Sequence, residues 1–424
     1  MPKYPEGLQL SHTHLRRMGR IWERLRRPHC VVAWESGARR LAFPGMPTPA
    51  SFDVYARRFP GQPLPPPPEE RVNTDTTGVQ LRPDVGMDSQ ANYVVVWEDD
   101  RDNNLLYQIY ARGFDAHGNE RFADFTVNNV YGGGDQKHPN VGVAPNGDFV
   151  VVWEDDRDRD GVHQIRGRGF YADGSEKFSE RTLNPTPRGQ QRMPAVAVDA
   201  YGNFVVVWED DRDRDGNWSI YAAGYDANGN LIHDETQVNT GPMTGWHLLP
   251  DVAATADGRF LVTWQFTRPE DLDPFMPRLR RELDVHDRAV WASRSVVLSR
   301  GFEADFGEMH AQTLVSPKEG RNLLPAVDTT DVGEYAVTWQ YNKRKFGFNF
   351  RILVRGLDAG GSERFAAKTA NKPVSGLHAA PDIAMLDNGT FVVVWCGTYT
   401  RFPRIERVPL LLDHRLDAAL DLGG

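Results

Sequence analysis

The stretch Phe149-Val-Val-Val-Trp153-Glu-Asp-Asp-Arg-Asp158 decides the fold, because close or looser copies of it recur along the chain. Its alternate side chains are apolar on both sides of an extended strand, so both faces of that strand must be buried. Four of the six intervals between successive copies are 55 or 56 residues long, which is the signature of a repeat architecture. The copies end at Trp34, Trp97, Trp153, Trp208, Trp264, Trp339 and Trp395.

Each repeat has the pattern of four short strands. A segment after a proline, such as Pro194–Val198, precedes the tryptophan strand; a third resembles Gln108–Phe114, and a fourth ends in Val127-Asn128. Valine, isoleucine and aromatic residues bounded by Gly, Asn and Asp are typical of strands and tight turns. Sheets that are apolar on both faces can be buried by stacking into a closed ring, whereas an open solenoid would need polar caps. We therefore predict an all-β fold, a seven-bladed β-propeller of four-stranded antiparallel blades, whose terminal strands complete one shared blade.

The repeat units resemble those of uncharacterised bacterial β-propeller modules in large surface and secreted proteins. The likeness rests on Val-Val-Val-Trp, then Ala-Arg-Gly-Phe-Asp-Ala-x-Gly, then Val-Asn, and covers residues 31–413. It implies a propeller fold and a surface or secreted location, and it implies no particular activity. Residues 1–30 lack the apolar stretch and small-residue cleavage site of a secretory signal, so the chain as given favours the cytoplasm instead.

Composition and charge exclude several classes of protein. The chain has 424 residues, 49 Lys and Arg against 58 Asp and Glu, a net charge of −9 and two cysteines. An acidic body does not offer the continuous basic face that nucleic acids need. No apolar run is long enough for a membrane span, and two cysteines provide neither a disulfide framework nor a thiolate zinc site. The oligomeric state is not indicated.

Three segments are expected. Residues 1–30 form a basic amphipathic segment with a short N-terminal helix in 11–27, residues 31–413 form the propeller, and residues 414–424 form a C-terminal tail. The helix has three alternative roles, which are packing on the acidic propeller, docking to a partner and contact with an anionic membrane surface. An insertion at 269–286, between the fifth and sixth tryptophans, should stand on the same face as the loops that follow the tryptophans.

The loops that follow Trp97, Trp153 and Trp208 are acidic, and two of them have the spacing of a calcium loop. Aspartates at positions 1, 3 and 5 with Gly at position 6 direct alternate oxygens at one hard cation. The predicted ligands are Asp156, Asp158, Asp160, Asp211, Asp213 and Asp215. Position 12, where a helix-flanked calcium loop places a glutamate, is Gly167 in one loop and Ala222 in the other. The alternative is a solvated acidic loop in which Arg157 or Arg212 pairs with its neighbours.

A second set of polar residues recurs where one blade leads into the next. The motif Gly-x-(Gln/His/Asn)-x-x-Pro and the residue after each tryptophan lie at the same end of the blades. The predicted ligand-binding residues are Gln80, Gln136, Gln191, His247, His378, Glu98, Glu154, Glu209 and Trp246, and Asn322 completes the motif in a sixth repeat. The alternative is that these amides and carboxylates satisfy backbone groups between blades.

The function that these patterns favour is a non-catalytic binding scaffold. It would present a glycan or protein ligand face at the mouth of the central channel, with calcium ordering the acidic loops. The alternative is a glycan-processing hydrolase that uses carboxylates on the same face, with Glu98, Glu154 and Glu209 as its candidates. A residue that recurs with every repeat more often serves the fold, so no catalytic residue is assigned. A third alternative is a purely structural repeat module.

Overall fold

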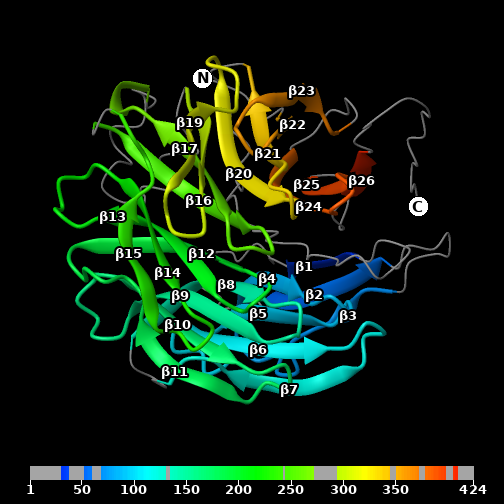
Figure 1. The fold of residues 1–424 in the computed structure, drawn as a ribbon. Helices are drawn as coiled ribbons and strands as arrows, with labels where there is room; N and C mark the ends of the chain where they lie inside the picture. The colour runs from blue at the N-terminus through cyan, green and yellow to red at the C-terminus, as the bar shows by residue number, and fades with distance from the viewer. Residues whose placement is uncertain are drawn as a thin grey trace, which may run out of the picture.

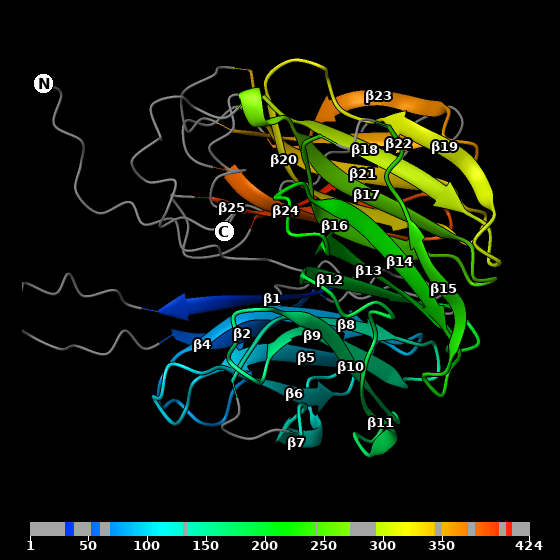
Figure 2. The ribbon, with the colours of Figure 1, turned by 90° about the vertical axis from the view of Figure 1, so that its left-hand side faces the viewer.

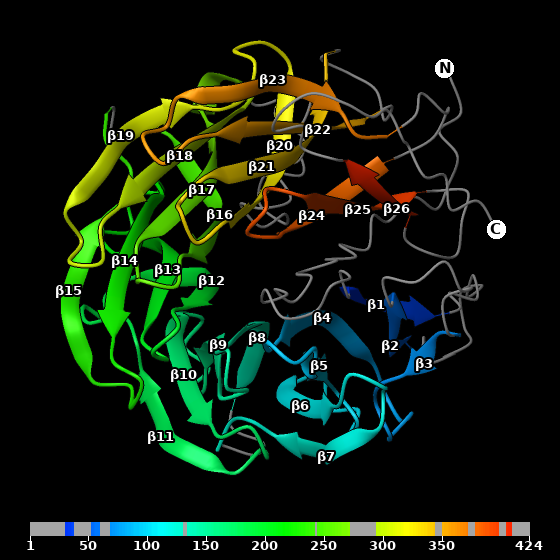
Figure 3. The same cartoon turned by 45° about the vertical axis from the view of Figure 1, so that its right-hand side comes forward.

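The computed structural model describes residues 30–37, 52–59, 68–129, 134–241, 244–271, 294–343, 350–371, 378–397 and 404–408. These residues form seven antiparallel sheets that follow one another in chain order from β1 to β26 (Figures 1 and 2). The sheets stand around a ring, with the first strand of each complete sheet toward the centre and the fourth at the rim (Figure 3). The prediction of an all-β propeller is confirmed. The predicted helix in 11–27 and the tail at 414–424 lie outside the described residues.

Five of the seven sheets show four strands, and the first and last show three in the described part of the chain. The first sheet contains β1 (Cys30–Gly37), β2 (Phe52–Phe59) and β3 (Glu70–Arg71). The second contains β4 (Gln80–Met87), β5 (Tyr93–Asp99), β6 (Gln108–Phe114) and β7 (Glu120–Thr126). The third contains β8 (Asp135–Val143), β9 (Phe149–Asp156), β10 (Gln164–Phe170) and β11 (Glu176–Thr182).

The remaining sheets repeat this order. The fourth contains β12 (Gln190–Val198), β13 (Phe204–Asp211), β14 (Ser219–Tyr225) and β15 (Leu231–Gln237). The fifth contains β16 (Trp246–Ala254), β17 (Phe260–Thr267), β18 (Val296–Phe302) and β19 (Glu308–Leu314), with a 3-10 turn η1 (Pro269–Asp271) after β17. The sixth contains β20 (Arg321–Thr329), β21 (Tyr335–Asn342), β22 (Arg351–Leu357) and β23 (Glu363–Thr369), and the last contains β24 (His378–Met385), β25 (Phe391–Gly397) and β26 (Arg404–Val408).

The tryptophan strand is buried on both faces, as its sequence requires. Val150 and Val152 of β9 pack on one side with Trp208 and other residues of the fourth sheet. Val151 and Trp153 pack on the opposite side with the second sheet. Trp153 and Trp208 are both 0% exposed. The hydrophobic core therefore lies between neighbouring blades, and each blade is stable only with neighbours on both sides.

The ring closes by packing between the first and last sheets. Val32 and Trp34 of β1 form one buried cluster with Val394 of β25. Within the described residues, β1 pairs with β2, whereas β24, β25 and β26 form a separate sheet. Completion of one blade by terminal strands stays a prediction. In the described part of the chain, burial of these apolar side chains holds the first and last sheets together.

Candidate active site at the channel mouth

Two sets of loops come together on one face of the ring, which we call the channel-mouth face. One set follows the tryptophan strands, and the other leads from an outer strand into the next inner strand. The inner strands begin at this face with a β-bulge, whose residue has a positive φ of about 50° in each complete blade and in the last one. These bulge residues are Arg82, His138, Met193, Leu249, Leu324 and Ala380.

The predicted glutamates connect consecutive blades through these bulges. Glu98 accepts a hydrogen bond from the amide of His138 at 2.7 Å, Glu154 from that of Met193 at 2.8 Å, and Glu209 from that of Leu249 at 2.5 Å. Gln265 and Gln340 make the same contact in later blades. The three glutamates are at most 2% exposed. Their recurrence is therefore explained by the joining of blades, and their ligand-binding role stays a prediction.

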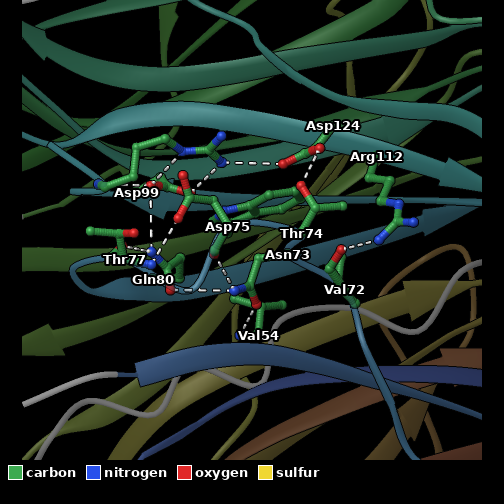
Figure 4. A network of polar contacts seen from close by, with 12 residues as sticks. Val54, Val72, Asn73, Thr74, Asp75, Thr77, Gln80, Asp99, Arg112 and Asp124 are labelled. Carbon is green, nitrogen blue, oxygen red and sulfur yellow. Dashed lines mark hydrogen bonds and ion pairs between the residues drawn. The ribbon is translucent and has the colours of Figure 1, made fainter.

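The predicted ring of amides is also hydrogen bonded inside the fold. Gln80 Oε1 accepts from Asn73 Nδ2 at 3.3 Å, and Gln80 Nε2 donates to Thr77 O at 2.7 Å (Figure 4). Gln136 and Gln191 likewise accept from Asn128 and Asn184, which follow the outer strand of the preceding blade. All three glutamines are 0% exposed. These contacts favour the alternative in which the amides satisfy polar groups where blades meet.

The other predicted binding residues lie in similar positions. His247 Nδ1 accepts from Trp264 Nε1 at 2.9 Å, and Asn322 Oδ1 accepts from Trp339 Nε1 at 3.0 Å. Trp246 is 8% exposed and packs with Trp218 and leucines of the fifth blade, while its Nε1 donates to Gly216 O. The backbone of His378 begins β24, and its side chain lies outside the described residues. The described side chains of His247, Asn322 and Trp246 are therefore all buried and offer no exposed surface on which a sugar could stack.

The acidic loops divide into a buried and an exposed half. Asp155 is 3% exposed, accepts from Trp153 Nε1 at 3.4 Å and pairs with Arg157 at 2.7 Å. Arg157 also pairs with Glu180 of the outer strand. The equivalent residues of the fourth blade, Asp210 and Arg212, repeat this arrangement, and the arginine stacks over a tyrosine ring. The first acids of each loop thus hold the end of the tryptophan strand.

The later aspartates converge as the calcium pattern predicts. Carboxylate oxygens of Asp156, Asp158 and Asp160 lie within 4.8 Å of one another, and those of Asp211, Asp213 and Asp215 do the same. Burial and the neighbouring Asp213 and Asp215 raise the pKa of Asp211 to about 6. Acidic groups that could hold a metal are therefore present in both loops.

A group of ionisable side chains at the mouth of blades two and three was not predicted from the sequence. Arg82 Nη1 pairs with Glu98 Oε2 at 2.8 Å, and His138 Nδ1 lies 2.6 Å from Glu154 Oε1. Arg82 and His138 are the bulge residues of their blades, where four later blades have Met, Leu, Leu and Ala. Their side chains are 26% and 16% exposed, so they reach solvent where the glutamates do not. Comparison of the repeats at this one position would have revealed them.

Lys137 and Tyr107 complete this group. Lys137 precedes His138, is 29% exposed, pairs with Asp135 and lies 5.8 Å from the centre of the Tyr107 ring. Tyr107 is half-buried, and its amide donates to Asp135 Oδ1. Burial, with the charges of Glu98 and Asp100, raises the pKa of Tyr107 to about 12. Tyr107 therefore keeps its proton at neutral pH. We call Arg82, Tyr107, Lys137, His138 and their two glutamates the mouth cluster.

The pKa values of the two glutamates of the mouth cluster are displaced in opposite directions. Burial raises the pKa of Glu98 despite the Arg82 guanidinium beside it. Burial acts in the same direction on Glu154, but His138, with help from His163 and Arg192, lowers the pKa of Glu154 well below its ordinary value. Glu154 is thus a carboxylate that orients the His138 ring, and its contact with Nδ1 leaves Nε2 as the nitrogen that can take up a proton.

Comparisons with known proteins identify the fold. No family model matches the chain, and no curated protein matches it. Among solved structures, it is similar to a PL25 ulvan lyase bound to -[GlcA(1-4)Rha3S]-, with a TM-score of 0.55 at 10% identity over 94% of each chain. It also matches an α-L-arabinofuranosidase from Fusarium graminearum (TM-score 0.48, 10% identity, 75% of this chain and 88% of the other). An α-L-arabinanase from Penicillium chrysogenum gives a TM-score of 0.47 at 13% identity, over 75% of this chain and 89% of the other.

These findings correct the prediction of a non-catalytic binding scaffold. One solved structure that shares the fold over 94% of each chain is that of a polysaccharide lyase, so in that protein the fold carries glycan-processing chemistry. The expectation that the chain is more likely not an enzyme is corrected on the same ground, and the glycan-processing alternative is taken up as a proposal below. Within the described residues, no helix has the length and apolar character needed to cross a membrane.

Proposed function

We propose that the protein is a glycan-processing enzyme that cleaves an acidic polysaccharide at the mouth cluster by β-elimination. The observation that carries the proposal is the His138–Glu154 pair at 2.6 Å, next to two partly exposed cations and a protonated tyrosine. The saccharide in the ulvan lyase structure contains GlcA, an acidic sugar, which agrees with cations at the site. In contrast to the recurring glutamates, the histidine occurs at only one of the six bulge positions of the described blades.

The chemistry follows from the charges of these side chains. In β-elimination a base removes the proton at C5 of a uronate, the bond from C4 to the glycosidic oxygen breaks, and a double bond forms between C4 and C5. Arg82 and Lys137 would stabilise the negative charge that develops on the uronate carboxylate. His138, held by Glu154, would accept the C5 proton, and Tyr107 would donate its proton to the departing oxygen. The proton taken and the proton given balance over the two steps.

Hydrolysis is a second candidate, favoured by one observation. Glu98 and Glu154 have pKa values displaced in opposite directions, and a pair displaced in this way is typical of an acid and a base. Both carboxylates are almost fully buried and bonded to the backbone of the next blade. Elimination at the more exposed His138 is therefore the better supported reaction.

The experiment that tests the activity compares acidic with neutral glycans. Purified protein is incubated with ulvan, polygalacturonate and arabinan, and new chain ends are followed by ultraviolet absorbance and by a reducing-sugar assay. We expect new ends from a uronate polymer with ultraviolet absorbance, and none from arabinan. Reducing ends without absorbance would favour the hydrolase, and activity on arabinan alone would contradict the acidic substrate.

We also propose that calcium binds the two aspartate clusters and orders the loops between β9 and β10 and between β13 and β14. Three carboxylates within 4.8 Å repel one another unless a cation or a proton lies between them. Aspartate oxygens at alternating positions with Gly at the sixth position are ligands that calcium prefers. Burial, with the charges of Asp213 and Asp215, raises the pKa of Asp211, so this carboxylate is partly compensated by a proton when no cation is bound.

Calcium should stabilise the protein more strongly at pH 7 than at pH 5. The pKa of Asp211 in the folded protein is about 6, above its ordinary value of 3.8, so the stability that its proton provides is lost as the pH rises through 6. Calcium replaces this proton and, well above its dissociation constant, should raise the unfolding midpoint by about 3 to 6 °C at pH 7. Differential scanning calorimetry with calcium and with chelator measures the shift.

The control for this prediction comes from a third loop. The double variant Asp158→Asn with Asp213→Asn should abolish the shift. Asp102→Asn should preserve it, because Asp102 lies in the loop whose fifth position is Asn104. Equal midpoints with calcium and with chelator in the unmodified protein would remove the calcium proposal.

A further inference from the structure

A pocket of about 490 Å³ lies on the channel-mouth face between the third and fourth blades. Its walls come from the loop between β9 and β10, the loop that leads into β12, and the loop between β13 and β14. Five arginines line it, against three aspartates. The arginines are Arg157, Arg166, Arg188, Arg212 and Arg214.

Three of these arginines are held by acids of their own blades. Arg157 and Arg166 both contact Glu180, and Arg212 contacts Asp210 and Glu235 at 2.8 and 2.7 Å. Their charges are compensated, and their side chains form a rigid wall. They give the pocket its shape without leaving it a free positive charge.

Arg188 and Arg214 differ from the other three. Both are exposed and line the pocket, and neither has a side-chain partner within the described residues. Arg188 comes from the loop that leads into β12, and Arg214 lies in the next loop with a positive φ of 58°. Two guanidinium groups that enter one pocket from different loops can bind a carboxylate or a sulfate by paired hydrogen bonds.

The pocket and the mouth cluster both use residues at the end of β9 and the start of β10. Asp155 in its wall directly follows Glu154, and Val162 and Gln164 in its wall flank His163, which acts electrostatically on Glu154. A glycan chain that passes over His138 can therefore extend outward across the third blade into the pocket. The pocket is larger than a single anion needs and has the size range of a ligand site.

We propose that this pocket binds the carboxylate or sulfate group of a sugar residue beside the one that is cleaved, through Arg188 and Arg214. The inference rests on the proposed function for the identity of the ligand as an acidic glycan. Asp158 and Asp160 also line the pocket and would repel an anion. The calcium proposed for the Asp156 cluster neutralises them, so anion binding should strengthen when calcium is present.

The test is isothermal titration calorimetry of the full chain with two probes, an oligosaccharide of alternating GlcA and Rha3S and inorganic sulfate, each with calcium and with chelator. Arg188→Gln combined with Arg214→Gln should weaken binding of the oligosaccharide about tenfold or more. Arg71→Gln is the matched control, because Arg71 is exposed on the outer strand β3 of another blade. It should leave the dissociation constant unchanged.

The outcomes separate this inference from the proposed activity. Equal affinity of the double variant and the Arg71→Gln control for the oligosaccharide would contradict anion binding by Arg188 and Arg214. Absence of binding of both probes by the unmodified protein would contradict it as well. Equal dissociation constants for inorganic sulfate and for the oligosaccharide would contradict recognition of a glycan and indicate a simple anion site. Binding of the oligosaccharide that depends on Arg188 and Arg214, without cleavage of any acidic glycan, would support the anion-binding role of the pocket and contradict the proposed enzymatic activity.

Discussion

His138→Ala is expected to lower the rate of cleavage of an acidic polysaccharide by about 100-fold or more, because it removes the base of the proposed reaction. The loss should fall on kcat rather than on KM, since the cations that bind the uronate remain. The pH profile should also lose the limb that reports on the base. Initial rates measured from pH 5 to pH 9 with the best substrate provide both readings.

The control for His138 must show that the fold survives. His117→Ala removes a histidine whose side chain is 85% exposed on a turn and should leave cleavage unchanged. The bulge hydrogen bond of residue 138 uses its backbone amide, so the blade junction to Glu98 is retained in His138→Ala. Full activity of a folded His138→Ala variant would exclude the histidine as the base.

Glu209→Ala is expected to destabilise the protein by about 2 to 4 kcal/mol, since it leaves the buried amide of Leu249 without its charged acceptor and opens a small cavity between two blades. Urea denaturation followed by tryptophan fluorescence measures this loss. The effect should be on stability, because Glu209 lies outside the mouth cluster.

The chain itself supplies the matched control for this prediction. Glu209→Gln retains an acceptor oxygen for Leu249, as Gln265 and Gln340 do at the same position of later blades. It should cost less than about 1 kcal/mol. If both variants lost the same free energy of unfolding, the charge of Glu209 rather than its hydrogen bond would be responsible.

The fold could be predicted because its cause is local and repeated. Valines on alternate sides of the strand before Trp153 require burial on both faces, and seven such strands have no other simple way to achieve it. Closure could be predicted only in part. The sequence indicated that the termini meet, but the contact of Val32 with Val394 depends on which strands pair, and that is decided by the whole ring.

The candidate site was less accessible to sequence reasoning. A motif search selects residues that recur, and here Glu98, Glu154 and Gln80 recur because each blade must satisfy the same backbone groups. His138 was missed because it breaks the repeat instead of forming it. Its pairing with Glu154 joins the inner strand of a blade to the tryptophan strand beside it.

The arginine-lined pocket could not be predicted for a different reason. Arg188 and Arg214 lie in two loops that belong to different repeats, and neither loop is unusual alone. Only the curvature of the ring brings them to one hollow. In contrast, the two aspartate clusters could be predicted, because their ligands lie within five residues of one another and need no long-range contact.

Mass spectrometry of the products from an acidic polysaccharide tests elimination at the mouth cluster most directly. The protein should release oligosaccharides that are one water lighter than hydrolysis products and carry a carbon–carbon double bond at the new non-reducing end, and His138→Ala should release none. Products that have gained water, or an unmodified protein that leaves every uronate polymer intact, would contradict the proposed reaction.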